Sequence, residues 1–349
     1  MERFAEALAS RLTDQGNAVC LVTRTEAEGS EPDRPYRVVR RPSAERVIAL
    51  ARSADVVHVN GLSLRSVGLG VASRRPTVVT HQGHQAVCPT GLCMPRRGDC
   101  TAGPTLGPCA GCPERGLRSA LDVWVHSVGC LADAANVAVS DYLRSRLGLR
   151  RSQTVYSPVS DAAFAAATDA AGEDGLVVFA GRLVAEKGLD LLLRAIALVP
   201  DAHLEVVGDG PMLSTYRDLV EELSLSLRVS FLGSQTFDGV AAAYARASVV
   251  CVPTTCEEAF GFAAAEAMAM RRPLVVTPSG ALSELCADGR GYVAADRAPR
   301  TIAASLQAAL DDEEDRARRA GSAHAFALER LTTDRAGAAY QGVYESVIR

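Results

Sequence analysis

The second half of this 349-residue sequence alternates short apolar runs with segments of helical character at a regular pitch. Six apolar runs, near residues 177, 204, 229, 249, 274 and 292, are each followed by such a segment. Short apolar runs of this kind are typical of strands that are buried on both faces of a parallel sheet. The alternation therefore predicts a doubly wound α/β domain with helices on both faces of its sheet.

The first half repeats the pattern less regularly. An alanine-rich run after Ser160 that extends to Gly175 is interpreted as a linker, so the chain is predicted to hold two doubly wound domains with a cleft between them, residues 1–160 and 161–335. The predicted strands of the first half are 18–23, 36–40, 55–61, 76–80, 137–139 and 154–156. Its predicted helices are 2–15, 44–51, 62–72, 117–135 and 141–147.

Two carboxylates flank one strand-to-helix turn of the second half. The apolar run 249–253 leads into a polar turn that carries Glu258, and a helix predicted over 262–270 carries Glu266. Ligands bind at the carboxyl edge of open α/β sheets, so both carboxylates can face one crevice. The amides of Phe260, Gly261 and Phe262 open the helix and can face an anion. A solvated acidic turn is the alternative interpretation.

A second turn carries the only lysine of the chain. Lys187 lies in the segment 181–188, GRLVAEKG, between a strand near 177 and a helix over 189–199, and it stands beside 36 arginines. Phosphate sites often use a compact ammonium group, so a single lysine at this position indicates an anion site. A chance result of codon usage is the alternative.

In order and spacing, these two turns resemble the retaining GT-B glycosyltransferases of family 4, which carry G-R-x4-K-G and, some seventy residues later, E-x7-E. The resemblance covers about residues 140–310 and includes the segments 208–211 (GDGP), 231–233 (FLG) and 279–281 (SGA) followed by Glu284. It implies that the second domain binds a nucleotide-diphosphate sugar, that the first binds a hydroxyl acceptor, and that a helix over 336–349 crosses back to the first domain.

The resemblance also implies roles for individual residues. Arg182 and Lys187 would contact the donor diphosphate and stabilise it as it leaves. Gly181, which precedes Arg182, would also lie in the donor site. Glu258 would hold the donor sugar and Glu266 the ribose. Gly233 and Ser234 would lie next to the nucleobase. His81, at the end of a predicted strand, would face the transferred sugar, with His84 as a competing candidate and a satisfied strand-end histidine as the plain alternative. Transfer is expected to need no metal, because no D-x-D motif stands at a plausible strand end.

Five cysteines gather in a glycine- and proline-rich insert at 84–116. A pair with metal-ligand spacing, 109 and 112, favours structural zinc, while free thiols, disulfides and an iron–sulfur cluster stay open. The cysteines are Cys88, Cys93, Cys100, Cys109 and Cys112.

The charge of the chain excludes some partners and leaves others open. A formal net charge of −4 argues against nucleic acid as the main partner. Residues 1–157 hold 20 Arg against 14 Asp and Glu, a balance of +6, which would allow peripheral membrane contact or mean only a solvated face. No signal peptide or membrane-spanning run is visible, so a cytoplasmic location is expected. Gly208 to Gly210 is too short for a dinucleotide fingerprint.

Domains of the resembled family begin with a buried strand and a glycine-rich turn, whereas Met1 opens directly on a predicted helix. We therefore expect a truncated form of a chain with roughly 15–35 more residues, less stable and nearly inactive. Two other functions also stay open, a nucleotide-sugar epimerase of the same fold and a catalytically impaired partner subunit. The sequence does not predict the donor sugar, its base or the acceptor.

Overall fold

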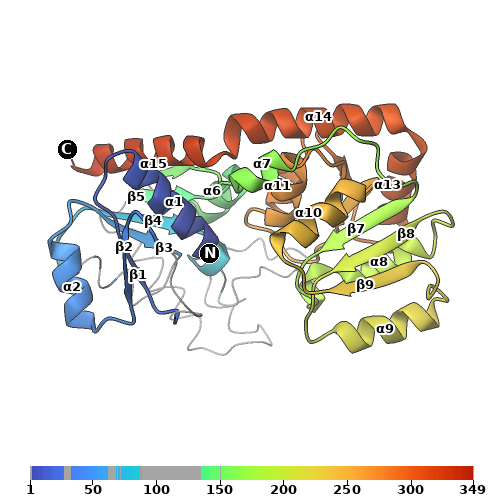
Figure 1. The fold of residues 1–349 in the computed structure, drawn as a ribbon, viewed down its shortest axis with the longest axis horizontal. Coiled ribbons are helices and arrows are strands. Elements are labelled where there is room, and N and C mark those ends of the chain that lie inside the picture. Colours follow the sequence, from blue (N-terminus) through green and yellow to red (C-terminus); the bar gives the residue numbers. More distant parts are fainter. Residues whose placement is uncertain are drawn as a thin grey trace. The chain divides into compact units, whose positions relative to one another are not determined.

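The computed structural model describes residues 2–26, 33–61, 72–86, 135–149 and 151–348, together with Gly68, Gly70 and Cys88. The chain divides into two compact units, the first formed by Met1–Pro158 with Thr332–Arg349 and the second by Val159–Leu331. These boundaries lie two to four residues from those that the sequence predicts. Figure 1 shows the elements of each unit.

The second unit is built on a six-stranded parallel sheet. The spatial order β12-β11-β10-β7-β8-β9 places the first strand, β7, between β8 and β10. The order of the strands reverses between β7 and β10, which is where such sheets bind ligands. All six predicted strands are confirmed. They are β7 (Leu176–Ala180), β8 (His203–Val207), β9 (Val229–Gly233), β10 (Val249–Val252), β11 (Leu274–Val276) and β12 (Tyr292–Val293).

Helices cover both faces of this sheet. On one face α8, α9 and α13 share an apolar core with the strands, and on the other α10 and α11 pack against β7 and β10. Helix α14 and the short α7 lie against α11. The described helices of the unit are α7 (Asp161–Ala165), η2 (Ala185–Lys187), α8 (Leu189–Ile196), α9 (Leu213–Glu222), α10 (Phe237–Arg246), α11 (Phe262–Ala269), α12 (Ala281–Leu285), α13 (Pro299–Asp311) and α14 (Glu313–Arg330).

The interpretation of 160–175 as linker throughout is wrong at its start. Helix α7 begins after Ser160, which has the extended backbone of an N-cap residue. The alanines that follow are strong helix formers, and Ala163 is fully buried. The composition that looks like a linker therefore supplies one turn and a half of packed helix.

The first unit contains two described parallel sheets, β1-β2 and β3-β4-β5-β6. Among the described strands, β1 pairs only with β2, and β3 pairs only with β4. The predicted helices at 62–72 and 117–135 lie largely outside the described residues, and Ala135, where the second was predicted to end, begins strand β5 instead. The described elements are β1 (Cys20–Thr23), β2 (Arg37–Arg40), β3 (Val57–Asn60), β4 (Thr77–His81), β5 (Ala135–Ala138), β6 (Ser152–Thr154), α1 (Glu2–Asp14), α2 (Ala44–Arg52), η1 (His84–Ala86), α6 (Asp141–Leu147) and α15 (Thr333–Ile348).

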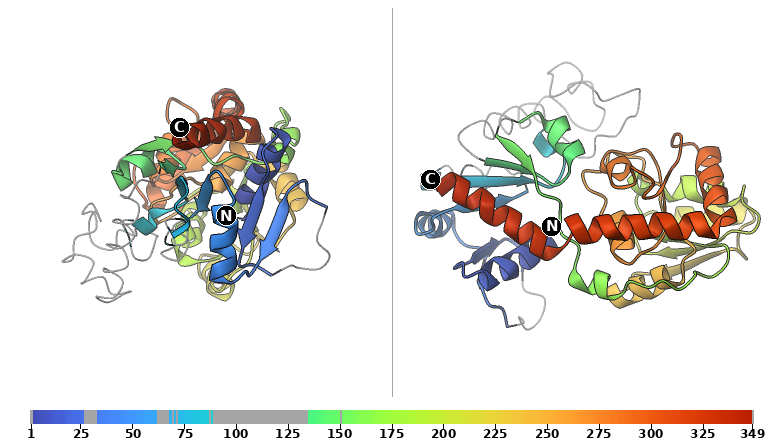
Figure 2. Two further views of the ribbon diagram at one scale, coloured as in Figure 1. Left: turned by 90° about the vertical axis from the view of Figure 1, so that its left-hand side faces the viewer. Right: turned by 90° about the horizontal axis from the view of Figure 1, so that it is seen from above.

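Helix α15 belongs to the core of the first unit, where it packs against α1 and β4 (Figure 2). A buried polar chain fixes it there. The hydroxyl of Tyr344 lies 2.8 Å from Nδ1 of His58, whose Nε2 lies 2.7 Å from Oγ1 of Thr80, and Tyr340 contacts the same Oγ1 at 2.8 Å. None of the described helices is long and apolar enough to cross a lipid bilayer.

Candidate active site

The turns that follow β7 and β10 are tied together by hydrogen bonds at the carboxyl edge of the sheet. The carbonyl of Glu186 accepts from the amide of Thr255 at 2.9 Å and from Oγ1 of Thr254 at 2.8 Å. Gly188, with φ of +70°, lets the two turns approach, because a Cβ atom there would lie 2.1 Å from the carbonyl oxygen of Pro253. The relative position of the two turns is thus set by the backbone.

This contact brings Lys187 and Glu258 together. Nζ of Lys187 donates to Oε1 of Glu258 at 2.6 Å, and the Glu258 side chain is only 15% exposed. Burial of the ammonium lowers the pKa of Lys187, but the charge and hydrogen bond of Glu258, together with Cys256 and Glu186, raise it by more, so that the net pKa lies above the ordinary value. Lys187 therefore carries a full positive charge at neutral pH, beside a carboxylate 71 positions away in the sequence.

The turn after Glu258 opens helix α11 toward this edge. Gly261 is the N-cap residue with φ of +90°, and a Cβ atom there would approach Leu282 to 2.5 Å. The Phe260 ring is buried, whereas Phe262 is 41% exposed, and their centroids lie 5.0 Å apart. The predicted helix is confirmed, and its first amide groups are available to a negatively charged ligand.

Glu266 lies farther along α11 and is half-buried. Burial, and then the charge of Glu266, raise the pKa of Tyr244 in α10, so the two side chains are neighbours.

The remaining predicted donor residues lie at the ends of β7, β8 and β9. The amide of Gly181 donates to Val207 at 2.9 Å, and that of Gly208 donates to Gly233 at 2.8 Å. A Cβ atom at Gly208 would lie 1.9 Å from the carbonyl oxygen of Gly181, so the turns are closely packed. Arg182 and Ser234 have exposed side chains at the same edge. Arg182 forms no ion pair within the described part of the chain.

His81 belongs to the first unit, at the end of β4, and is 1% exposed. Its Nε2 lies 3.0 Å from Oδ1 of Asn136, which can only accept, so Nε2 carries the proton and Nδ1 is the basic nitrogen. Nδ1 is buried and has no hydrogen-bond partner among the described residues. Burial lowers the pKa of His81, although its bond to Asn136 raises it. His84, the competing candidate, is also buried, with its ring 6.0 Å from that of Tyr142.

The zinc prediction stays a prediction. Cys88 is described and buried, while the other four cysteines of the insert lie outside the described residues. Within the described ranges, no group of three or more His, Cys, Asp or Glu residues could hold a metal ion.

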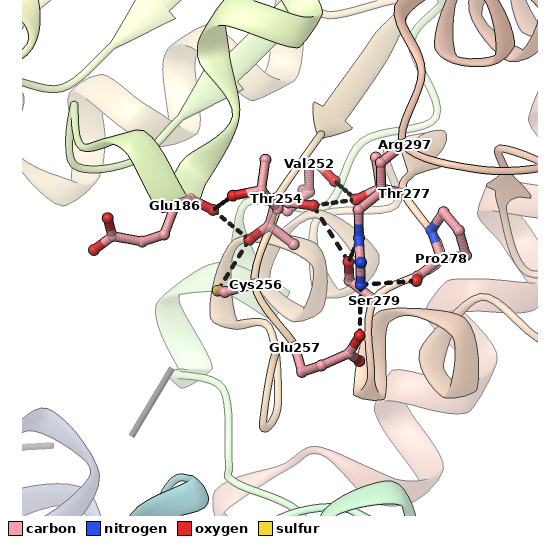
Figure 3. Close-up of polar contacts among 10 residues, drawn as sticks. Glu186, Val252, Thr254, Cys256, Glu257, Thr277, Pro278, Ser279 and Arg297 are labelled. Atoms are coloured by element: carbon pink, nitrogen blue, oxygen red, sulfur yellow. Dashed lines mark hydrogen bonds and ion pairs between the residues drawn. The ribbon is translucent and has the colours of Figure 1, made fainter. Parts of the chain in front are cut away.

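A polar network that the sequence does not indicate includes Glu257, the neighbour of Glu258 in the chain (Figure 3). Arg297, in the loop between β12 and α13, donates to Oε1 of Glu257 at 2.5 Å, to Oγ of Ser279 at 3.0 Å and to the carbonyl of Pro278 at 3.3 Å. Ser279 and Thr277 both donate to the carbonyl of Thr254. No local sequence signal marks Arg297, because its partners lie 18 to 40 positions away.

Gly188→Ala should separate the two turns. The new methyl group would overlap the Pro253 carbonyl, and alanine disfavours a positive φ, so we expect a loss of stability on the order of 2–4 kcal/mol and an activity loss in the folded fraction. Thermal and denaturant unfolding measure the first effect. Gly148→Ala is the matched control, because Gly148 has φ of +57° and a methyl group added there would meet no atom within 4 Å. Equal effects of the two substitutions would show that strain alone, and not the contact, is responsible.

The second unit aligns with a known family. Residues 161–325, from α7 into α14, match the model of glycosyl transferases group 1. This match makes the second unit similar to glycosyl transferases group 1 over nearly its whole length. The match contains both turns of the site, including Lys187 and Glu258.

Curated relatives are similar to part of the chain. A D-inositol 3-phosphate glycosyltransferase of Corynebacterium glutamicum is 34% identical over 154 residues, which are 41% of this chain and 37% of that protein. An alpha-D-kanosaminyltransferase of Streptomyces kanamyceticus is 28% identical over 177 residues, 49% of this chain and 46% of that protein. The chain thus spans less than half the length of these curated relatives.

Solved structures extend the likeness to the whole fold. The Anabaena protein HepE in complex with UDP and glucose aligns with a TM-score of 0.73 at 18% identity, over 99% of this chain and 95% of that one. A glycosyltransferase from Rickettsia africae aligns with a TM-score of 0.77 at 13% identity, over 100% and 95%. The fold is that of the GT-B glycosyltransferases, and the predicted fold class is confirmed.

Proposed function

We propose that this protein is a retaining glycosyltransferase that moves a sugar from a nucleotide-diphosphate donor to a hydroxyl acceptor. The observation that carries the proposal is the contact of 2.6 Å between Lys187 and Glu258, which joins the two motif turns at the switch point of a group 1 sheet. An ammonium, a carboxylate and a helix start converge there, as the chemistry of donor cleavage requires.

Each residue has a distinct part in this proposal. As the glycosidic bond breaks, negative charge develops on the departing nucleoside diphosphate, and Lys187, Arg182 and the first amides of α11 stabilise that charge. Glu258 accepts hydrogen bonds from sugar hydroxyls and fixes the sugar, while Glu266 holds the ribose. For His81 we keep the role that the family resemblance implies, a hydrogen bond to the transferred sugar. No step in this scheme is assigned to a metal ion.

The comparisons support a uridine donor as the first to test. HepE was solved with UDP and glucose and also with UDP-glucose. The relatives include proteins named D-inositol 3-phosphate glycosyltransferase and alpha-D-kanosaminyltransferase. We accordingly take UDP-glucose as the first probe.

Ligand-induced stabilisation tests the donor. The protein is melted with UDP, GDP, ADP and UDP-glucose. A nucleotide at 100 times its dissociation constant should add about 2.7 kcal/mol to the stability of the unit that binds it. Lys187→Ala should remove most of that gain. No shift with any nucleotide at millimolar concentration would contradict the proposal.

Product analysis tests the reaction. Incubation with the donor and hydroxyl acceptors should give a glycoside with the anomeric configuration of the donor. An inverted product would disprove retention. Release of free sugar at the same rate with and without acceptor would favour a nucleotide-sugar epimerase or hydrolase instead.

A further inference from the structure

Three loops at the carboxyl edge of the second sheet meet at one guanidinium group. The loop after β10 contributes Glu257, and the loop after β11 contributes Ser279. The loop after β12 contributes the guanidinium group itself, that of Arg297 (Figure 3). The planar fork of an arginine can hold several acceptors in fixed directions at once. Neither Glu257 nor Arg297 has a role in the group 1 motifs described above.

The loop that carries Glu258 is held from both sides of that residue. On one side the carbonyl of Glu258 accepts from the amide of Ala281 at 2.9 Å. On the other, the neighbouring side chain of Glu257 is held by Arg297 at 2.5 Å. The start of the loop is fixed as well, because the carbonyl of Thr254 accepts from Thr277 at 2.8 Å and from Ser279 at 3.2 Å.

We propose that Arg297 is a positioning residue that acts through Glu257 to aim the Glu258 carboxylate at Lys187. Glu257 and Glu258 are neighbours in one loop, so holding the Glu257 side chain restrains the backbone from which the Glu258 side chain extends. The pair Glu257–Arg297 is partly exposed, with side chains 24% and 26% accessible, so its removal should alter this loop without unfolding the unit. This inference rests on the proposed function for its kinetic part only.

The single lysine of the chain permits a test that does not depend on activity. Protein labelled with ¹⁵N-lysine has one side-chain ammonium signal, that of Lys187. An ammonium held in an ion pair exchanges protons slowly and gives a resolved Nζ–H signal, whereas a free one broadens. The signal therefore reports directly on the contact with Glu258.

The variants are Arg297→Gln, Glu257→Gln and the double variant, which removes the pair with no net change of charge. We expect the Nζ–H signal of Lys187 to broaden in all three. Turnover with UDP-glucose should fall by about tenfold, while the dissociation constant of UDP stays within twofold. The double variant should be no worse than the worse single variant, because both residues act through one contact. Arg297→Lys should restore part of the turnover, since it keeps the charge but not the fork.

Arg300→Ala is the control, an exposed arginine three positions along in α13. An unchanged lysine signal and unchanged turnover in folded Arg297→Gln would overturn the proposal and leave Arg297 a stabilising residue. A tenfold weaker affinity for UDP would overturn it in another way, by showing that Arg297 contacts the donor. If no nucleotide sugar supports turnover in the wild type, the proposed function fails, and the lysine signal still decides the positioning role.

Discussion

Glu258→Gln and Lys187→Ala should each lower turnover with the donor sugar by about 10- to 100-fold. Each substitution removes a charge-assisted contact worth roughly 1.5–3 kcal/mol, and 1.4 kcal/mol corresponds to one decade in rate. Lys187→Ala also leaves Glu258, only 15% exposed, beside no compensating ammonium. The measurement is steady-state turnover with UDP-glucose, after confirmation that both variants are folded.

Lys187→Arg is the informative companion to this pair. It keeps the positive charge but replaces a compact ammonium, held 2.6 Å from Glu258, by a larger planar group. We expect it to remain well below wild-type activity. If Glu258→Gln and Lys187→Ala both retain activity within threefold of the wild type, the assignment of this site is wrong.

Acidification should destabilise the first unit through His58. Burial lowers the pKa of His58 to about 4, against an ordinary value of 6.5, so the folded unit holds the imidazole neutral while the unfolded chain protonates it. The first unit therefore keeps its full stability above pH 6.5. It loses stability as the pH falls toward 4, because protonation of His58 favours the unfolded chain. Between pH 7 and pH 5 the loss should be about 2 kcal/mol, and it should reach about 3 kcal/mol by pH 4.

Amide hydrogen exchange in β3 and β4 measures this loss locally, which matters because a chain of two units need not unfold in one step. His58→Asn should be less stable at pH 7, because Tyr344 and Thr80 lose their shared partner, but it should lack this part of the pH dependence. His203→Gln, an exposed histidine of β8, is the control and should leave the profile unchanged. A wild-type profile in His58→Asn would exclude His58 as the source.

The central strands of the second unit, β7, β10 and β11, could be predicted because they are short apolar runs buried on both faces, as β10 shows with four buried residues. The sequence places the turns of Lys187 and Glu258 at one edge of the sheet. It does not predict the hydrogen bond between the two side chains, because that bond depends on the approach of Gly188 to Pro253.

Arg297 shows where prediction from sequence ends. It is one of 36 arginines, and its partners come from two other loops of the sheet edge. Only the order of β10, β11 and β12 in the sheet brings these loops together. The same holds for the buried contact of His58 with Tyr344, 286 positions away in the sequence.

The place of α15 in the first unit has a consequence for biosynthesis. Tyr340 and Val343 are buried in the core that Phe4 and Leu8 begin, so this core cannot close until residues 333–348 have left the ribosome. Every residue of the second unit has been made by then, and its sheet needs nothing from α15. Domains commonly fold in the order of their synthesis. Here the order is reversed. Residues 1–158 are translated first, but they cannot complete their core until α15 has been translated, after the whole of the second unit.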